Sequence, residues 1–205
     1  WRWNGDSMTK VGILGGTFDP VHWGHLIAAE QARATLGLGK IIFIPTGQPW
    51  IKAQSRITSR DHRFKMVQAA LVGYPHFEMS SIEIDKSGNS YTVDTLEDLS
   101  NQMDAKSDVF FLLGRDAAEN LHVWKRPCRI LELCTLVIMS RPGAKRAGLT
   151  KLKECPNHMH KIIEISVPPI DISGTEIRSN VAQGRSIHYL VQPVIRRLSL
   201  IHISE

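Results

Sequence analysis

The feature that most constrains this chain is a glycine-rich junction near its start, between an apolar run and a pair of histidines. Residues 11–16 read Val-Gly-Ile-Leu-Gly-Gly, a short apolar stretch typical of a buried strand that ends at a glycine pair. Asp19-Pro20 predicts a turn, and His-Trp-Gly-His follows at residues 22–25, where a helix can begin. A strand that passes through a tight turn into a helix is the basic unit of α/β folds.

The same junction has the chemistry of a phosphate site. Gly15 and Gly16 have no Cβ, so their backbone can bend sharply and lie close to a ligand. A helix that begins here presents unpaired backbone N–H groups and a partial positive charge, which favour an anion. His22 and His25 are three residues apart and share a helical face, where two imidazoles can donate hydrogen bonds to oxygens that gain charge during a reaction.

Each part of the junction also has a plain structural interpretation. A Gly-Gly pair after a strand is often only a turn, and a histidine near a helix start is usually a surface or core residue. The junction is not a Walker A loop, because no Gly-Lys-Ser/Thr follows, and it is not a Gly-x-Gly-x-x-Gly motif. As a whole it resembles the signature of nucleotidyltransferases that carry a His-x-Gly-His motif.

Further apolar runs continue the α/β pattern. Buried strands are expected at 40–45, 108–113 and 135–140, and alternating ones at 77–84 and 161–167. Helices are expected from about residue 24 to a stop at Gly37 and Gly39, from a cap at Ser59 to a stop at Gly73, and after a cap at Thr92 or Thr95. This order predicts a Rossmann-like, doubly wound, mainly parallel sheet with helices on both faces, in one domain over residues 8–205. Residues 1–7 precede Met8 and are expected to be a tag or an upstream extension.

Charge and composition argue against several other classes of protein. A length of 205 residues suffices for one sizeable core and is short for two. The net charge of +5 suits anionic small molecules, but no dense Lys/Arg block or interleaved aromatic platform indicates nucleic-acid binding. No apolar run reaches membrane-spanning length, and no signal peptide is recognisable, so a cytoplasmic protein without membrane contact is expected.

The cysteines predict free thiols. Cys128, Cys134 and Cys155 are odd in number and lack Cys-x-x-Cys spacing, which argues against a disulfide framework and favours a reducing compartment. Cys155 with His158 and His160 has some of the ligands of a zinc site, but the spacing is irregular and a fourth ligand is missing. We therefore expect no protein-bound metal here.

A second helix start near the end of the chain has similar chemistry. Ser173 and Glu176 have the spacing of a capping box, so a well-capped helix with no further role is the structural alternative. The helix again follows a predicted strand, and Arg178 lies one turn into it, where a guanidinium can bind phosphate oxygens in a bidentate manner. We expect Gly16 and Ser173 to face each other across one crevice that holds a polyphosphate.

Two side chains between these junctions have open interpretations. Lys52 lies in a polar loop that follows a predicted strand, at the sheet edge where ligands bind, and it contacts phosphate or is simply a solvated lysine. Trp124 lies in a polar, basic stretch, where it is either a stacking platform for a flat ring or a cover for the edge of the core.

From residue 8 to about residue 196 the chain resembles the bacterial nicotinate-nucleotide adenylyltransferases. Gly-Gly-Thr-Phe-Asp-Pro at 15–20 with His-x-Gly-His at 22–25 matches the first superfamily motif, and Ile-Ser-x-Thr-x-Ile-Arg at 172–178 matches the second. The segments similar to the nicotinate branch in particular are 90–96, 113–116, Trp124, 184–187 and 189–191.

The resemblance implies that ATP and nicotinate mononucleotide react, with Mg²⁺, to give deamido-NAD and pyrophosphate. The catalytic residues it implies are His22, His25 and Arg178. Its ATP-binding residues would be Gly15, Gly16, Thr17, Phe18, Gly114, Asp116, Ser173 and Thr175. Its acceptor-binding residues would be Lys52, Tyr91, Thr92 and Trp124, with Trp124 stacked on the nicotinate ring. No residue of the chain is implied as a metal ligand.

Three positions depart from the family pattern. Trp50-Ile51 stands before Lys52 where the family commonly has Pro-His, which removes a histidine that could contact the substrate. Trp23 is bulky for its place inside His-x-Gly-His, and Gln192 replaces a usual proline. None of them removes a phosphate-binding residue.

Alternatives remain open at this point. A sister enzyme would use nicotinamide mononucleotide or phosphopantetheine, and phosphopantetheine would not need stacking on Trp124. A nucleotide sensor of another class would bind ATP but release no pyrophosphate when an acceptor is added. The sequence does not indicate the oligomeric state.

Overall fold

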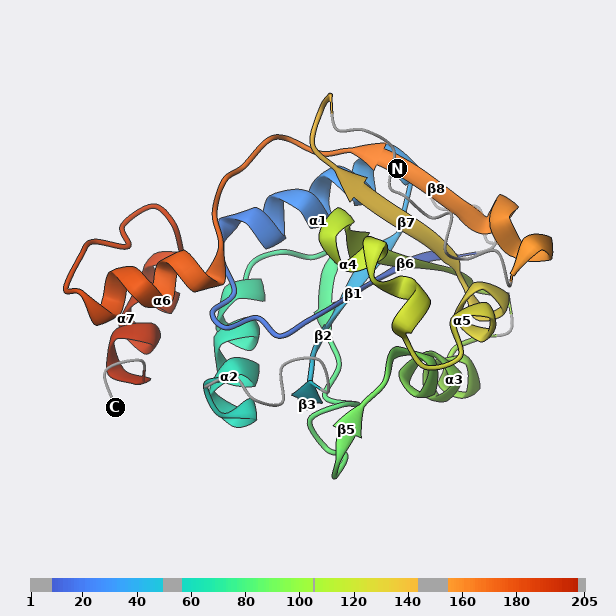
Figure 1. The fold of residues 1–205 in the computed structure, drawn as a ribbon. Coiled ribbons are helices and arrows are strands. Elements are labelled where there is room, and N and C mark those ends of the chain that lie inside the picture. Colours follow the sequence, from blue (N-terminus) through green and yellow to red (C-terminus); the bar gives the residue numbers. More distant parts are fainter. Residues whose placement is uncertain (1–8, 50–56, 105, 144–154, 203–205) are drawn as a thin grey trace.

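The computed structural model describes residues 9–49, 57–104, 106–143 and 155–202, and its centre is one parallel sheet (Figure 1). The strands run in the order β4-β2-β1-β6-β7-β8, and every neighbouring pair is parallel. Their bounds are β1 Lys10–Gly16, β2 Lys40–Pro45, β4 Phe77–Met79, β6 Asp108–Gly114, β7 Thr135–Ser140 and β8 Ile162–Ser166. The chain winds outward from β1 through β2 to β4, then returns to β6 and winds the other way. The switch point, where α/β sheets bind ligands, therefore lies between β1 and β6.

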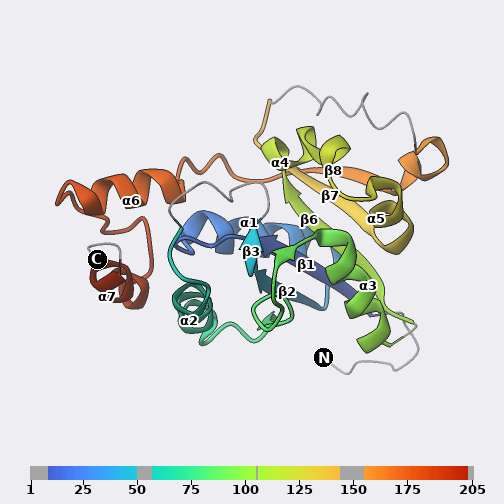
Figure 2. The same ribbon diagram turned by 60° about the horizontal axis from the view of Figure 1, so that its bottom comes forward.

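Helices cover both faces of the sheet, as predicted. Their bounds are α1 Trp23–Leu36, α2 Arg60–Leu71, α3 Thr92–Gln102, α4 Arg115–Glu119, α5 Pro127–Leu133, α6 Gly174–Ala182 and α7 Pro193–His202. One core joins the sheet to α1, α2, α6 and α7, and a second joins its other face to α3, α4 and α5. In two views α6 and α7 lie at one end of the molecule and α3 and α5 at the other (Figures 1 and 2).

The four central strands, β1, β2, β6 and β7, are mostly apolar because both of their faces are buried, whereas the outer strands β4 and β8 also carry Glu78 and Glu164. In β1, Val11 and Ile13 pack into the core under α3 to α5, whereas Leu14 packs into the core under α1 and α2. The glycine signals at helix ends are also confirmed. Gly37 follows α1 in the left-handed region, with φ of 64°, a conformation that glycine adopts without strain.

Local details around α2 and α3 differ from the prediction. The segment 77–84 forms only the three-residue β4, and a turn follows in which the Ile84 N–H donates to the Ser81 carbonyl. Neither threonine caps α3. Its N-cap is Tyr91, and the Thr95 hydroxyl instead donates to Glu83. Ser59 caps α2 as predicted, by accepting from the His62 N–H.

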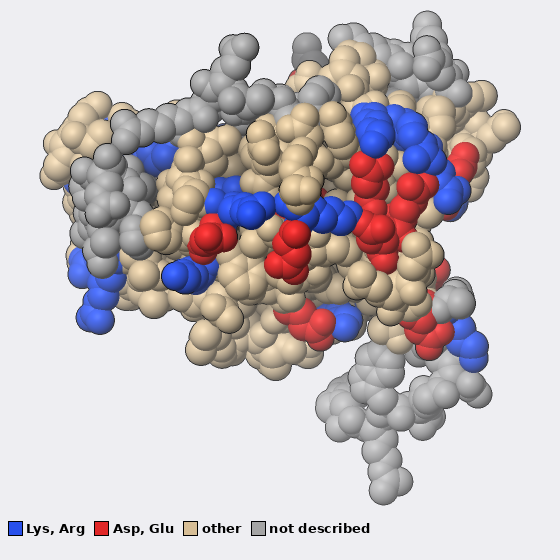
Figure 3. Space-filling model, turned by 90° about the horizontal axis from the view of Figure 1, so that it is seen from below, with Lys and Arg blue, Asp and Glu red and all other residues tan. Residues whose placement is uncertain are grey.

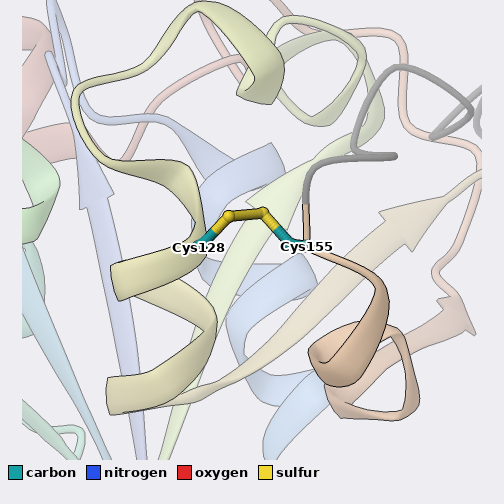
Figure 4. Close-up of a disulfide and its surroundings, with 2 residues drawn as sticks. All are labelled: Cys128 and Cys155. Carbon is teal, nitrogen blue, oxygen red and sulfur yellow. A yellow bond between two sulfur atoms is a disulfide. The ribbon is translucent and has the colours of Figure 1, made fainter.

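The prediction of free thiols is wrong for two of the three cysteines. Cys128, in α5, and Cys155, just before the 3-10 helix η4 (Pro156–Lys161), form a disulfide (Figure 4). The two residues are 27 positions apart, so the pairing depends on packing of α5 beside η4 and not on any local spacing. Cys134 keeps a free, buried thiol, and burial raises its pKa to about 12. Among the described residues no cluster of three or more His, Cys, Asp or Glu side chains could hold a metal.

Charged side chains on the face seen from below lie with opposite signs side by side (Figure 3). Several such pairs join α3 to α5 and to the residues before it. Lys125 binds Asp94, and Glu97 accepts from both Arg126 and Arg129. Exposed pairs of this kind add little stability individually, so we regard them as solvated contacts that orient α5. None of the helices in the described residues is both long enough and apolar enough to cross a membrane.

Candidate active site

A cleft of about 900 Å³ opens at the carboxyl ends of β1 and β6. The turn after β1 contributes Thr17, Phe18, Asp19, His22 and His25 to its lining. The β6–α4 junction contributes Gly114, Arg115 and Asp116, and the start of α6 contributes Ser173, Gly174, Thr175 and Arg178. Gly16 lies between two lining residues, Gly15 and Thr17. The two helix starts singled out in the sequence therefore share one cleft.

The turn between β1 and α1 is held by a buried aromatic ring. Phe18 is 2% exposed, and its backbone lies in the left-handed region, with φ of 49°. The edge of its ring meets His25, with 5.0 Å between the ring centroids. Because a bulky residue rarely adopts positive φ, burial of the phenyl ring has to stabilise this turn. Phe18 therefore shapes the cleft mainly from beneath.

His22 and His25 form a stacked pair at the start of α1. Their ring centroids are 3.7 Å apart, and the His22 backbone N–H donates to Nδ1 of His25 at 3.3 Å. An Nδ1 that accepts a hydrogen bond places the ring proton of neutral His25 on Nε2, which can then donate. Burial lowers the pKa of His22 to about 4, so this imidazole is neutral at neutral pH. His22 thus offers directional hydrogen bonding and not fixed positive charge.

The start of α6 lies directly against the Asp19 turn. A Cβ on Gly174 would stand 2.8 Å from the Asp19 carbonyl oxygen, so only glycine permits this approach. The Ser173 hydroxyl accepts from the Glu176 N–H at 3.1 Å, which confirms its predicted capping role. Arg178 donates through Nη1 to the Asp19 carbonyl at 2.5 Å and through Nη2 to the Thr175 hydroxyl at 3.4 Å. Its guanidinium therefore stands between the two helix starts.

Asp19 is the polar centre of this junction, and the sequence reasoning gave it no role beyond the turn. Its Oδ2 accepts from the Thr58 N–H at 3.2 Å, while Oδ1 is buried with no hydrogen-bond partner among the described residues. A buried polar atom without a partner indicates a place for water or a ligand. The Asp-Pro pair in the sequence gave a hint of this role, but the same pair is also typical of an ordinary turn.

Three of the predicted acceptor residues, Tyr91, Thr92 and Trp124, are absent from the lining of the cleft. Tyr91 and Trp124 both pack against the core under α3 to α5, and Trp124 meets Phe111 edge-on at 6.3 Å. The indole N–H of Trp124 is buried without a hydrogen-bond partner among the described residues. Nζ of Lys125 lies 4.6 Å from the Tyr91 ring centroid and ties the two segments together. Trp124 thus covers the edge of the core, and its stacking role stays a prediction. Lys52 lies outside the described residues.

The structure describes two of the three positions that depart from the family pattern. Trp23 packs partly buried against the core under α1 and α2. Gln192 donates to the Ala70 carbonyl at 3.1 Å and to the Tyr74 hydroxyl at 3.3 Å, which ties the start of α7 to α2. Neither side chain lines the cleft. The third departure, at Trp50 and Ile51, lies outside the described residues.

Sequence reasoning missed the two buried charges behind the cleft. Arg63 and Glu83 are each less than a tenth exposed. The signal for Arg63 is its position, since residues 63, 66, 67 and 70 fall on the core-facing stripe of α2 and only this one is charged. Nothing in the sequence around Glu83 distinguishes it from an ordinary turn carboxylate.

Comparisons with known proteins agree on the family. The model of the cytidylyltransferase-like family matches residues 13–180. A protein of Dehalococcoides mccartyi named "Probable nicotinate-nucleotide adenylyltransferase" is 41% identical over 187 residues, covering 91% of this chain and 92% of its own. A protein of the same name from Thermoanaerobacter is 38% identical over 192 residues, covering 92% of this chain and 90% of its own.

Solved structures extend the comparison to the fold. The Plasmodium falciparum nicotinic acid mononucleotide adenylyltransferase complexed with NaAD superposes with a TM-score of 0.74 at 18% identity. The overlap covers 93% of this chain and 94% of the other. The same Plasmodium enzyme complexed with APC superposes with a TM-score of 0.71. The Rossmann-like α/β architecture expected from the sequence is thereby confirmed.

Proposed function

The chain belongs to the cytidylyltransferase-like family and, within it, to the nicotinate-nucleotide adenylyltransferases, and from this premise we propose how its cleft works. It transfers the adenylyl group of ATP to nicotinate mononucleotide, and the products are deamido-NAD and pyrophosphate. The observation that carries the proposal is the meeting of two helix starts on one cleft, with Arg178 reaching across to Asp19.

The reaction needs no covalent intermediate on the protein. A phosphate oxygen of the mononucleotide attacks the α-phosphorus of ATP, and the bond from that phosphorus to the bridging oxygen of the β-phosphate breaks. Pyrophosphate leaves with the bonding electrons. The protein has to align the two reactants and offset the charge that gathers on the phosphate oxygens. Alignment alone can lower the barrier by about 7–11 kcal/mol.

The proposed catalytic roles follow from the local chemistry of each helix start. His25 donates from Nε2 to an oxygen that gains charge, and His22 supports it as a neutral, buried partner. Arg178 supplies permanent positive charge and a forked donor set from the opposite side. Ser173 and Thr175 stand at the exposed start of α6 and would meet the outer phosphates.

The remaining ATP contacts fall on the two sheet ends that form the cleft. We propose that Gly15, Gly16, Thr17 and Phe18 shape the wall at β1, and that Gly114 and Asp116 meet the adenosine at the end of β6. On the acceptor side we propose Tyr91, Thr92 and Trp124 around the nicotinate ring, with Lys52 as a further contact. The indole N–H of Trp124 is buried and has no hydrogen-bond partner among the described residues, which supports the presence of a polar substrate group beside it.

Mg²⁺ fits this cleft as an ion that enters with ATP. Mg²⁺ prefers phosphate oxygens, water and one or two carboxylates over a cage made only of protein. The cleft offers such a carboxylate in Asp19, whose Oδ1 lacks a partner among the described residues, and Asp116 lines the same space. We propose that these two carboxylates face the ion, which would draw charge from the phosphates.

A pyrophosphate-release assay tests the proposed function. The protein is supplied with ATP and Mg²⁺, and with nicotinate mononucleotide, nicotinamide mononucleotide or phosphopantetheine in parallel. We expect the highest kcat/KM with nicotinate mononucleotide. Preference for either other acceptor would assign the chain to a sister activity. Binding of ATP without release of pyrophosphate with any acceptor would identify a nucleotide sensor and overturn the proposal.

A further inference from the structure

Arg63 binds three separate loops at the cleft end of the sheet. It is the largest fully buried side chain of the described residues, at 1% exposed. Its Nη1 donates to the Thr17 carbonyl at 2.7 Å, and its Nη2 donates to the Gly47 carbonyl at 2.8 Å. Nε donates to the Thr58 carbonyl at 3.0 Å. A buried guanidinium is costly unless its donors are paired, so these contacts fix the three carbonyls relative to one another.

Glu83 binds the loop at Gly47 from the side opposite Arg63. Its carboxylate accepts from the backbone N–H of Gly47 and from the Thr95 hydroxyl, the latter at 2.7 Å. It is 8% exposed, and burial raises its pKa. Gly47 therefore has its N–H bound to Glu83 and its C=O bound to Arg63. The two buried charges are on either side of this one residue.

The packing around Gly47 leaves no room for a side chain at this position. A Cβ on Gly47 would lie 2.1 Å from the Glu83 carbonyl oxygen and 3.0 Å from Oγ of Ser90. The next two residues form β3 (Gln48–Pro49), which pairs in parallel with β5 (Asn89–Ser90). Directly after β5 come Tyr91 and Thr92, at the start of α3. The position of Gly47 thus sets the position of the segment that enters α3.

A continuous path of hydrogen bonds links this segment to the ATP side of the cleft. Arg178 donates to the Asp19 carbonyl, and the Thr58 N–H donates to the Asp19 carboxylate. Arg63 joins Thr58 to Gly47, and Glu83 continues from Gly47 to α3. Each link is between groups on different segments of the chain.

We propose that Arg63 and Glu83 are positioning residues that hold the segment 90–92 at a fixed distance from the turn 17–19 by binding Gly47 from both sides. Neither residue lines the cleft, so neither is catalytic. Their role is to keep the acceptor and the α-phosphate of ATP in line. The identity of the acceptor rests on the proposed function, whereas the coupling of the two segments does not.

Arg63→Lys is the main test, because lysine keeps the positive charge but lacks the planar guanidinium whose N–H groups reach three carbonyls. Misplacing reactants by about 1 Å costs about 100-fold in rate, so we expect kcat/KM for nicotinate mononucleotide to fall about 10- to 100-fold. The KM for ATP should change less. Glu83→Gln keeps an acceptor oxygen and should retain more activity than Glu83→Ala.

Two controls separate positioning from loss of stability. Arg33→Lys makes the same substitution at a partly exposed arginine that binds Glu30 in a bidentate manner on α1. Leu38→Ala removes a buried side chain just before β2, at the opposite edge of the sheet from the cleft. At an equal or larger drop in Tm, Leu38→Ala should leave kcat/KM within about 2-fold of the parent protein, because it moves no cleft loop.

Hydrogen exchange gives a readout that does not need turnover. In Arg63→Lys the amides of segments 17–19 and 89–92 should exchange faster together, while those of β7 stay unchanged. If Arg63→Lys does not fold, Thr95→Val removes only the hydroxyl that donates to Glu83 and should loosen 89–92 alone. Unchanged exchange in these segments, or a kcat/KM that falls no further than in Leu38→Ala, overturns the proposal. Absence of turnover in the parent protein would instead overturn the proposed function.

Discussion

The two helix starts that face the cleft differ in how much water reaches them. At the start of α1, Phe18, Asp19 and His22 are all buried. At the start of α6, Ser173 and Thr175 are exposed, and Ile177 is the buried side chain that anchors the helix to the core. The start of α1, the inner start, is therefore buried, and the start of α6, the outer start, is exposed to solvent.

This difference in burial accounts for the different chemical roles that we propose for the two helix starts. Burial lowers the pKa of His22 to about 4, so the start of α1 holds a neutral imidazole, which is stacked on the ring of His25. The outer start uses Arg178, which stays charged in any environment. Preorganised neutral donors are most effective where water is excluded, while a permanent charge still attracts phosphate where water is present. The comparison suggests that the inner start acts mainly in the transition state and the outer start mainly in binding.

The largest effects are expected when one side chain is removed from each helix start. His25→Ala should lower kcat about 100- to 1000-fold and change the KM for ATP little, because a lost preorganised donor costs about 2.7–4 kcal/mol. Arg178→Ala should raise the KM for ATP as well as lower kcat. Steady-state kinetics with varied ATP separates the two. An unchanged kcat in His25→Ala would refute its assigned role.

The disulfide offers a third region that touches neither helix start. Its loop closure over 27 residues should contribute about 3–4 kcal/mol to the free energy of unfolding. Reduction should therefore lower the urea midpoint strongly, yet leave kcat nearly unchanged, since neither Cys128 nor Cys155 lines the cleft. The Cys128→Ser/Cys155→Ser variant should not respond to reductant. A loss of kcat that parallels reduction would show that the cleft depends on this distant link.

The buried start should also make stability depend on pH. The pKa of His22 is about 4 in the folded protein, against 6.5 for an ordinary histidine. Above pH 6.5 both folded and unfolded states are neutral there. As pH falls from 6.5 toward 4, the unfolded state binds the proton first, so stability falls, by about 3 kcal/mol when the change is complete.

Urea unfolding of the parent protein and His22→Gln at pH 7 and pH 4 measures this contribution as a difference of differences. Subtracting the two proteins cancels the contributions of the other titrating groups to the free energy of unfolding. One of these is Glu83, whose raised pKa makes the folded protein less stable as pH rises. The parent protein should lose more stability than His22→Gln on acidification. Equal losses would mean that His22 is not held neutral by burial.

The smallest expected effect is at the outer start. Ser173→Ala removes the hydroxyl that accepts from the Glu176 N–H and should cost about 1 kcal/mol of stability. Serine-to-glycine replacement at the same position should cost only a few tenths of a kcal/mol. Urea midpoints of the two variants measure the contribution of this hydroxyl cap, which α1 lacks because its N-cap residue is a histidine. Equal midpoints for Ala and Gly would argue against a capping role.

The sequence predicted well what depends on local pattern. The apolar runs marked β1, β2, β6 and β7 because buried parallel strands need apolar side chains on both faces. The glycine and histidine junction, the Ser173 cap and the end of α1 at Gly37 followed from chemistry within a few residues. Their placement on one cleft then followed from parallel strand order, since every strand ends at the same edge.

What the sequence could not give depends on contacts between distant segments. Cys128 meets Cys155 only because α5 and η4 pack together, and an odd cysteine count argued against it. The bonds of Arg63 to Thr17 and Gly47 span 46 and 16 residues. Thr95 is a candidate helix cap in the sequence, but α3 begins at Thr92, so Thr95 lies inside the first turn and its hydroxyl donates to the buried Glu83 carboxylate. In each case tertiary packing overrides a sound local expectation.

Both helix starts should bind the same triphosphate. The decisive experiment is a crystal structure of the protein with an unreactive ATP analogue and Mg²⁺. We expect phosphate oxygens within hydrogen-bond distance of Nε2 of His25 and of the Arg178 guanidinium in one complex. A triphosphate that contacts one helix start and none of the side chains of the other would refute shared binding.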